Sequence, residues 1–181
     1  MSFKKLGTKE LHQHMSKMKV LISEPSVPFS SVIQQTMVAM GCNPENIWKE
    51  AEFAQALHLL NTVQPEIIIS EYHLGKGFGL ELAEKQSEYI NNPTDRIFIL
   101  VTGNASDSAV AEAAEEEIDG YILKPFNIKQ LQDTFLNVMH KKMNPTKYLS
   151  EIQKGKQHLQ NKEFSSARET FGQAKSFDKK P

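Results

Sequence analysis

Four polar residues stand where short apolar runs of the sequence end, and their side chains together have the chemistry of a charged site. They are Glu24 after KVLIS, Glu71 after IIIS, Thr102 after RIFILV and Lys124 after DGYIL. Carboxylates, a hydroxyl and an ammonium group can form charge-assisted hydrogen bonds with one another or with a bound ion. Such bonds require close side chains, so the elements that carry these residues decide whether a site exists.

The four apolar runs belong to a regular alternation of strand and helix patterns. Strand patterns occupy residues 19–23, 46–50, 67–70, 96–101 and 119–123, and helical patterns occupy residues 27–40, 51–62, 80–90, 106–117 and 127–141. This alternation predicts an α/β fold, a five-stranded doubly wound parallel sheet with helices on both faces. Because parallel strands end at one edge of such a sheet, we expect the four polar residues to meet there.

Three segments, PEIIISEYHLGKGFGLEL (65–82), VTGN (101–104) and GYILKPF (120–126), resemble the receiver domain of two-component response regulators. The resemblance covers residues 19–141 and implies the flavodoxin-like receiver fold. It implies that Glu71 stands at the phosphoacceptor position and that Thr102 and Lys124 would bind phosphoryl oxygens. Tyr121 matches the aromatic switch position, and the bond between Lys124 and Pro125 matches one that is often cis in the family.

The acidic residues depart from the receiver pattern. The family has an aspartate as phosphoacceptor, where this chain has Glu71, and two acids after the first strand that hold Mg²⁺ with it. Here that pair becomes Glu24-Pro25, or Ser23-Glu24 if the register slides by one residue. Either register lacks one carboxylate. The resemblance therefore implies a degenerate, pseudo-receiver-like site in which Glu24 and Glu71 hold Mg²⁺ weakly or not at all.

Glutamate in place of aspartate at position 71 has two expected consequences. The extra methylene displaces the carboxylate by about 1 Å or more, enough to slow an in-line phosphoryl transfer about a hundredfold. The longer side chain also reaches toward Lys124, and a charged hydrogen bond between the two would contribute roughly 1.5 to 3 kcal/mol. We therefore expect Glu71 to be a poor phosphoacceptor and to imitate the phosphorylated state.

Other kinds of chemistry find little support in the sequence. Gly75, Gly77 and Gly79 are not followed by the Gly-Lys-Ser/Thr of a phosphate-binding P-loop, and we interpret them as turn residues. The six histidines are scattered, and the single cysteine, Cys42, is expected to be buried or inert. No catalytic motif points to an enzyme, and no cofactor is expected apart from weakly bound Mg²⁺.

The sequence changes character near residue 141. Residues 1–140 hold 11 Lys and Arg against 18 Asp and Glu, whereas residues 141–181 hold 10 against 4. Residues 146–181 resemble the start of a tetratricopeptide array, because Gly155, Ala167, Phe171 and Ala174 fit the small and aromatic positions of one repeat. A single helix pair cannot bury its own apolar face. We therefore expect a longer protein, or packing of Phe171 and Phe177 on the receiver or on a second subunit.

Three domains are expected from these patterns. An N-terminal extension occupies residues 1–18, with a helix over 8–18 that lies outside the receiver core and carries Leu11, Met15 and Met18 at helical spacing. The receiver occupies residues 19–141. A tetratricopeptide-like helix pair, a C-terminal helical hairpin, occupies residues 146–181.

The predicted function is that of an atypical response regulator, a phosphorylation-independent signalling or scaffolding module that acts through protein contacts. Partners, and a possible homodimer, are expected on the face formed by residues 105–140, with further partners on the helix pair. Two alternatives stay open, a working phosphotransfer regulator and nucleic-acid binding by the basic tail, which is disfavoured because the tail has no aromatic stacking platform. With no run of eighteen apolar residues and no secretory signal pattern, we expect a cytoplasmic protein.

Overall fold

The computed structural model describes residues 8–103 and 118–177, and the chain divides into two compact units, Met1–Met139 and His140–Pro181. The first unit contains a five-stranded sheet made of β1 (Val20–Ser23), β2 (Ile47–Glu50), β3 (Ile67–Glu71), β6 (Ile97–Thr102) and β7 (Gly120–Leu123). The strand order is β2-β1-β3-β6-β7, and every neighbouring pair is parallel. The predicted doubly wound α/β fold is therefore confirmed.

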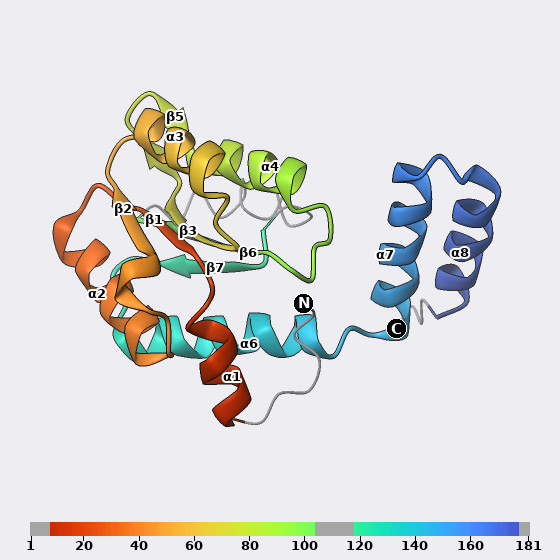
Figure 1. Ribbon diagram of the computed structural model, residues 1–181, viewed down its shortest axis with the longest axis horizontal. Coiled ribbons are helices and arrows are strands. Elements are labelled where there is room, and N and C mark those ends of the chain that lie inside the picture. Colours follow the sequence, from red (N-terminus) through yellow and green to blue (C-terminus); the bar gives the residue numbers. More distant parts are fainter. Residues whose placement is uncertain (1–7, 104–117, 178–181) are drawn as a thin grey trace. The chain divides into compact units, whose positions relative to one another are not determined.

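Helices cover both faces of this sheet (Figure 1). On one face lie α3 (Phe53–Val63) and α4 (Gly79–Tyr89), and on the other lie α2 (Val27–Ala39) and α6 (Ile128–Met143). A short 3-10 helix, η1 (Pro44–Asn46), precedes β2. The helix expected over residues 106–117 lies outside the described residues. None of the described helices combines the length and apolar character needed to cross a membrane.

Apolar side chains fill the space between the sheet and the helices α3 and α4. Leu21, Ile68 and Phe98 from the central strands pack with Leu60 and Leu82 from the two helices, and each of the five is at most 1% exposed. Full burial of one such side chain contributes about 1.5–3 kcal/mol. Strands covered on both faces are apolar throughout. This core therefore holds the strands in register and sets where their carboxyl ends, which carry the polar residues, come to lie.

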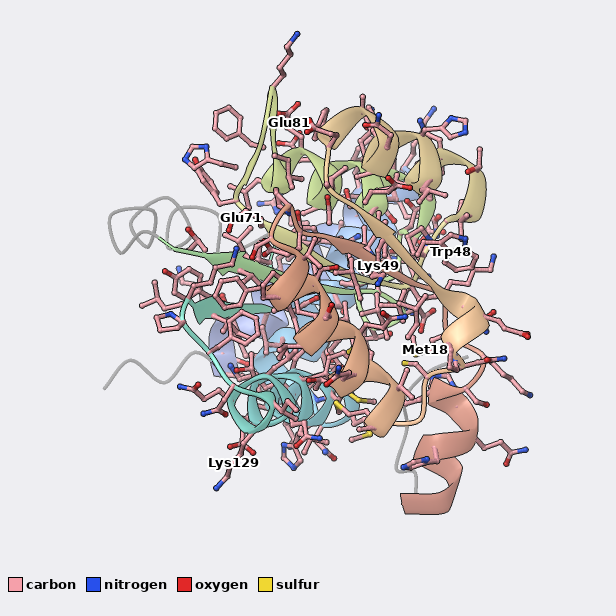
Figure 2. The ribbon with its side chains drawn as sticks, turned by 90° about the vertical axis from the view of Figure 1, so that its left-hand side faces the viewer. Met18, Trp48, Lys49, Glu71, Glu81 and Lys129 are labelled. Atoms are coloured by element: carbon pink, nitrogen blue, oxygen red, sulfur yellow. The ribbon has the colours of Figure 1, made fainter. Side chains whose placement is uncertain are left out.

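Helix α1 (Thr8–Met15) is shorter and more closely packed than the sequence predicted. The expected helix over residues 8–18 ends at Met15, and both Met15 and Met18 are buried, with 0% and 5% exposure. A Cβ built on Gly41 would meet the His12 ring at 2.8 Å, so α1 lies directly against the end of α2. The predicted N-terminal helix is therefore present, and its methionines are buried. Figure 2 shows Met18 well separated from Glu71, as expected for residues that precede β1 and end β3.

The glycine-rich loop after β3 forms a small hairpin that the sequence did not predict. Its strands, β4 (His73–Leu74) and β5 (Gly77–Phe78), pair antiparallel. Gly75 turns the chain with a φ of 65°, a backbone conformation that favours glycine. A Cβ built on Gly79 would collide with the carbonyl oxygen of Glu71. The interpretation as turn residues is thus right for Gly75, whereas Gly79 allows α4 to begin directly beside the end of β3.

The second unit contains two helices, α7 (Lys147–Gln160) and α8 (Phe164–Phe177), which form the expected C-terminal hairpin. The Thr146 hydroxyl caps α7 by accepting a hydrogen bond from the Leu149 amide at 3.2 Å. The buried residues of the hairpin are small: Gly155 on α7, and Ala167, Thr170 and Ala174 on α8. A Cβ built on Gly155 would collide with the Phe171 ring, so the missing side chain lets the two helices approach closely. Leu149, Leu159, Phe164 and Phe177 remain exposed on the surface of the hairpin.

Candidate functional site

The four polar residues singled out in the sequence lie around one open pocket at the carboxyl edge of the sheet. The pocket has a volume of about 360 Å³ and is lined by Glu24, Pro25, Ser26, Glu71, His73, Thr102, Gly103 and Lys124. Glu71 is the last residue of β3, Thr102 is the last residue of β6, and Glu24 and Lys124 directly follow β1 and β7. The parallel sheet therefore brings together residues that are up to 100 positions apart in the chain.

A single ammonium group lies between the two carboxylates of this pocket. Lys124 Nζ forms an ion pair with Glu24 Oε2 at 2.6 Å and a second ion pair, with a short hydrogen bond, to Glu71 Oε2. The side chains of Lys124, Glu24 and Glu71 are only 12%, 1% and 13% exposed. Attraction between charges is stronger where water is largely excluded. The cluster carries a net charge of −1, and its stability depends on the lysine remaining in place.

Backbone amides hold the other oxygen of each carboxylate. The Tyr72 amide donates to Glu71 Oε1 at 2.7 Å, and the Ser26 amide donates to Glu24 Oε1 at 2.8 Å. Each carboxylate therefore points one oxygen at its own chain and the other at Lys124. This arrangement fixes the orientation of both acids and leaves neither Glu71 oxygen without a partner.

An aromatic pair supports the lysine, although neither of its residues stands out in the sequence as part of the site. Lys124 Nζ lies 4.8 Å from the centroid of the Phe29 ring, which is a cation–π distance. The Phe29 ring stacks on Phe126 with centroids 5.2 Å apart. Phe126 belongs to the Lys-Pro-Phe segment, so its closeness to Lys124 could have been inferred. Phe29 gives no such signal, because its spacing assigns it only to the apolar stripe of its helix.

The backbone of β7 fixes the position of Lys124 beside β6. Leu123 pairs with Thr102, and the Lys124 amide donates to the Thr102 carbonyl at 2.8 Å. The Lys124-Pro125 peptide bond is cis, as the resemblance suggested. Thr102 is 1% exposed, and Tyr121 on β7 is half-buried against the core beneath α3 and α4. Thr102, which is expected to bind phosphate, and Tyr121, which is expected to act as the switch, thus lie on the adjacent strands β6 and β7.

The two registers left open for the acidic pair differ in which residues lie at the pocket. Glu24 and Pro25 line the pocket, whereas Ser23 is fully buried as the last residue of β1. Of the two candidate pairs, Glu24-Pro25 is therefore the one that lies at the pocket. Within residues 8–103 and 118–177, no group of three or more Asp, Glu, His or Cys side chains is placed to hold a metal ion.

Two other sequence expectations concern residues away from this pocket. Cys42 is 3% exposed, and burial raises the pKa of its thiol to about 12, so the prediction of a buried thiol is confirmed. The predicted output face at residues 105–140 is described only from residue 118 onward. In that part, α6 exposes Ile128 and Leu136, and Figure 2 shows Lys129 pointing away from the fold.

Solved structures of receiver domains share this fold. The chain is similar to a CheY-like response regulator receiver domain protein from Methanospirillum hungatei JF-1, with a TM-score of 0.57 and 20% identity over 69% of this chain and 95% of that chain. For the chemotaxis response regulator CheY4 of Vibrio cholerae, the TM-score is 0.54 and the identity 21%, over 67% of this chain and 98% of that chain. For the signal receiver domain of an HD domain-containing protein from Pseudomonas fluorescens Pf-5, the values are 0.56 and 22%, over 69% and 96%. At these identities the similarity establishes the fold.

Sequence comparison extends this result from fold to family. No curated protein sequence matches the chain. The family model of the response regulator receiver domain, however, matches residues 20–136, a stretch that includes all four polar residues of the pocket and excludes α1, α7 and α8. Because the match spans more than half of the 181 residues, the chain belongs to the family of response regulator receiver domains.

Proposed function

We propose that this chain is an atypical response regulator that signals or scaffolds through protein contacts and does not depend on phosphorylation. Receiver domains are signalling modules of two-component systems, and they contact proteins such as kinases and effector domains. The observation that carries the finer proposal is the pairing of Lys124 with both Glu24 and Glu71. The proposal keeps the cytoplasmic location expected from the sequence.

The ion pairs support the proposal because they already occupy the groups that a phosphoryl group would need. An incoming phosphate would have to draw Lys124 away from two carboxylates while adding negative charge to a cluster that is already negative. The attacking oxygen of Glu71 would also have to give up its bond to Lys124 or to the Tyr72 amide before it could act as a nucleophile. A carboxylate held in this way is better suited to be a permanent ion-pair partner of Lys124 than to accept a phosphoryl group.

Weak or absent Mg²⁺ binding is part of the same proposal. Mg²⁺ requires near-octahedral oxygen ligands, and among the described residues two carboxylates, Glu24 and Glu71, line the pocket. Pro25 stands where a third acid would be expected and has no side-chain oxygen. The Lys124 ammonium lies between the two acids, so a divalent cation would compete with a charge that the fold itself supplies. If bound, Mg²⁺ would supply charge neutralisation for phosphoryl transfer, with Glu24 and Glu71 as its protein ligands.

Incubation of the full chain with acetyl phosphate and Mg²⁺, followed by intact mass measurement, tests the proposal. We expect no labile gain of one phosphoryl group. A stoichiometric gain would favour the working phosphotransfer regulator, the alternative that the sequence leaves open, and would contradict the proposal. A receiver with an aspartate acceptor, treated in parallel, checks that the donor is active.

Two variants test the account of the site. Glu71→Asp alone should remain unphosphorylated, because the pocket would still have only Glu24 after β1 and hence a poor Mg²⁺ site. Glu71→Asp combined with Pro25→Asp restores the family pattern and is expected to gain a phosphoryl group. Full Mg²⁺-dependent phosphorylation of Glu71→Asp by itself would show that the missing second acid is unimportant.

A further inference from the structure

The two helices of the second unit present a surface that combines apolar and basic side chains and contains no acid. On α7 this surface consists of Leu149, Ile152, Lys156 and Leu159, and on α8 it consists of Phe164, Arg168 and Lys175. The spacings are three, four and three residues on α7 and four and seven residues on α8, which correspond to one or two helical turns, so each set forms one stripe along its helix. We call these seven residues the apolar-basic face.

The contacts between the helices show that both stripes lie on the same side of the hairpin. The stripe on the other side of α7 includes Lys147 and His158. Lys147 lies over the Phe177 ring at 5.8 Å, and His158 pairs with Glu163 at 2.5 Å. These two contacts occupy the side of the hairpin opposite the apolar-basic face. The acids Glu151 and Glu163 therefore lie away from it.

Exposure and charge show that this face lacks a partner within the described part of the unit. Leu149 and Leu159 are each 45% exposed and Phe164 is 68% exposed, whereas the interior of the hairpin is filled by small residues. Lys156, Arg168 and Lys175 are exposed, and none forms an ion pair with a carboxylate among the described residues. By contrast, Lys154 on the opposite side pairs with Glu151 at 2.6 Å.

We infer that the apolar-basic face binds an acidic amphipathic helix of another protein. An apolar stripe between two helices suits the apolar side of a third helix, and cations without partners beside it suit flanking acids. A nucleic acid fits less well, because Phe164 is the one strongly exposed aromatic ring on this face and base stacking normally uses several. Among the described helices a second copy offers a poorer match, because the acidic helix α4 buries its apolar residues Leu82 and Ala83 in its own core. The inference names a partner for the proposed scaffolding function and rests on it.

Fluorescence anisotropy with the full chain tests this inference. The probe is a labelled 18-residue peptide with leucines at helical spacing and glutamates beside them, and the control probe has the same composition in scrambled order. We expect a Kd of about 1–100 μM for the ordered peptide and at least roughly tenfold weaker binding of the scrambled one. Equal binding of the two peptides would overturn the inference.

Two lysine variants provide a matched control. Lys156 and Lys154 are exposed residues on the same helix, and reversal to glutamate changes the net charge equally. We expect Lys156→Glu to weaken binding of the ordered peptide at least about tenfold and Lys154→Glu to weaken it less than about threefold. Equal loss in both variants would indicate non-specific attraction and contradict the inference. Circular dichroism of each variant checks that the helices persist.

Two further outcomes would assign the face to another occupant. Tighter binding of an 18-nucleotide polythymidine than of the ordered peptide would favour a nucleic acid. A wild-type dimer in sedimentation that Lys156→Glu dissociates would favour a second copy of the chain. Either result overturns the inference. Phosphorylation of the receiver would contradict the proposed phosphorylation-independent function but would not affect peptide binding by the hairpin. The failure of one proposal can therefore be distinguished from the failure of the other.

Discussion

The receiver unit and the helical hairpin use lysine in opposite ways. In the receiver, Lys124 is nearly buried and is held by two carboxylates from other strand ends. In the hairpin, Gly155 and Ala174 fill the interior and the cations, such as Lys156, lie on the surface. A lysine that is withdrawn from water stabilises the fold only while its partners remain, whereas a surface lysine adds little to the fold and is available to another molecule. The buried Lys124 therefore has a structural role, whereas an exposed lysine such as Lys156 can take part in recognition.

The largest effect is expected where the lysine is buried. Lys124→Met leaves Glu24 and Glu71 as unpaired acids, and loss of one member of a buried ion pair costs about 3–5 kcal/mol. We expect a decrease of this size in the free energy of unfolding of the receiver, measured by urea titration with Trp48 fluorescence. The same substitution at Lys154, whose side chain is 58% exposed, should cost less than about 1 kcal/mol.

A neutral version of the cluster sharpens this comparison. Glu24→Gln and Glu71→Gln added to Lys124→Met should recover most of the lost stability, because no unpaired charge then remains. If Lys124→Met and Lys154→Met have equal effects, the distinction between the two units fails.

Packing of the hairpin is tested by two glycines of the same unit. Gly155→Ala places a methyl group against the Phe171 ring, and overpacking of this kind costs about 1–3 kcal/mol. A methyl group added to Gly172 in α8 would meet no atom within 4 Å beyond its chain neighbours and its own helix backbone, so Gly172→Ala should instead stabilise the helix by up to about 1 kcal/mol. Hydrogen exchange of the α7 and α8 amides should become faster in the first variant and slower in the second. Effects of the same sign would show that close approach of the helices does not depend on Gly155.

Cys42 offers a contrast to Lys124 because it is a buried ionisable group without a charged partner. Burial raises the pKa of its thiol from 9.0 to about 12, so the folded protein stabilises the neutral thiol. The resulting stability is fully present below pH 9 and is lost as the pH rises from 9 toward 12. At pH 10 the loss should be about 1.4 kcal/mol relative to neutral pH.

The stability of the wild type and of Cys42→Ala, measured by urea titration at pH 8 and pH 10, checks this prediction. Raising the pH from 8 to 10 should lower the free energy of unfolding of the wild type more than that of Cys42→Ala, since the variant has no thiol to ionise. Parallel pH dependences would mean that the thiol ionises as easily in the folded chain as in the unfolded one.

The smallest change in stability is expected for Glu71→Gln, because Lys124 keeps its ion pair with Glu24. We expect the free energy of unfolding to fall by about 1 kcal/mol, because glutamine still offers Lys124 a neutral hydrogen-bond acceptor, and the backbone amide resonances of Thr102 and Tyr121 to shift. Glu88→Gln, which removes a carboxylate from an exposed pair with Lys85, should leave those resonances in place. Unchanged Thr102 and Tyr121 resonances in Glu71→Gln would mean that the glutamate does not control the switch region.

The order of strands and the meeting of the four polar residues could be predicted from the sequence, because buried parallel strands are strongly apolar and end at a common edge. The same reasoning placed Glu71 beside Lys124. It could not foresee that Glu24 would share the same ammonium, because that depends on side-chain direction after β1 and not on strand order. The β4–β5 hairpin was missed because its strands have only two residues each, too few for any periodicity to show.

The extent of α1 was mispredicted for a different physical reason. Met15 and Met18 follow helical spacing, yet the helix ends at Met15 and both side chains are buried. The spacing of apolar residues indicates which side chains face the core, but it does not fix where a helix ends. A turn after Met15 can direct the Met18 side chain to the same interior. The packing of His12 against Gly41 could not be read from spacing, since it joins segments that are separated along the chain.

The position of Lys124 also has a consequence for the rates of folding and unfolding. Its ammonium joins β7 to the ends of β3 and β1, across sequence separations of 53 and 100 residues. Contacts between such distant segments need much of the sheet to be in place, so they are expected to form after the main barrier to folding has been crossed. Loss of such contacts speeds unfolding and leaves the folding rate nearly unchanged. The buried lysine would then act chiefly by prolonging the lifetime of the native state.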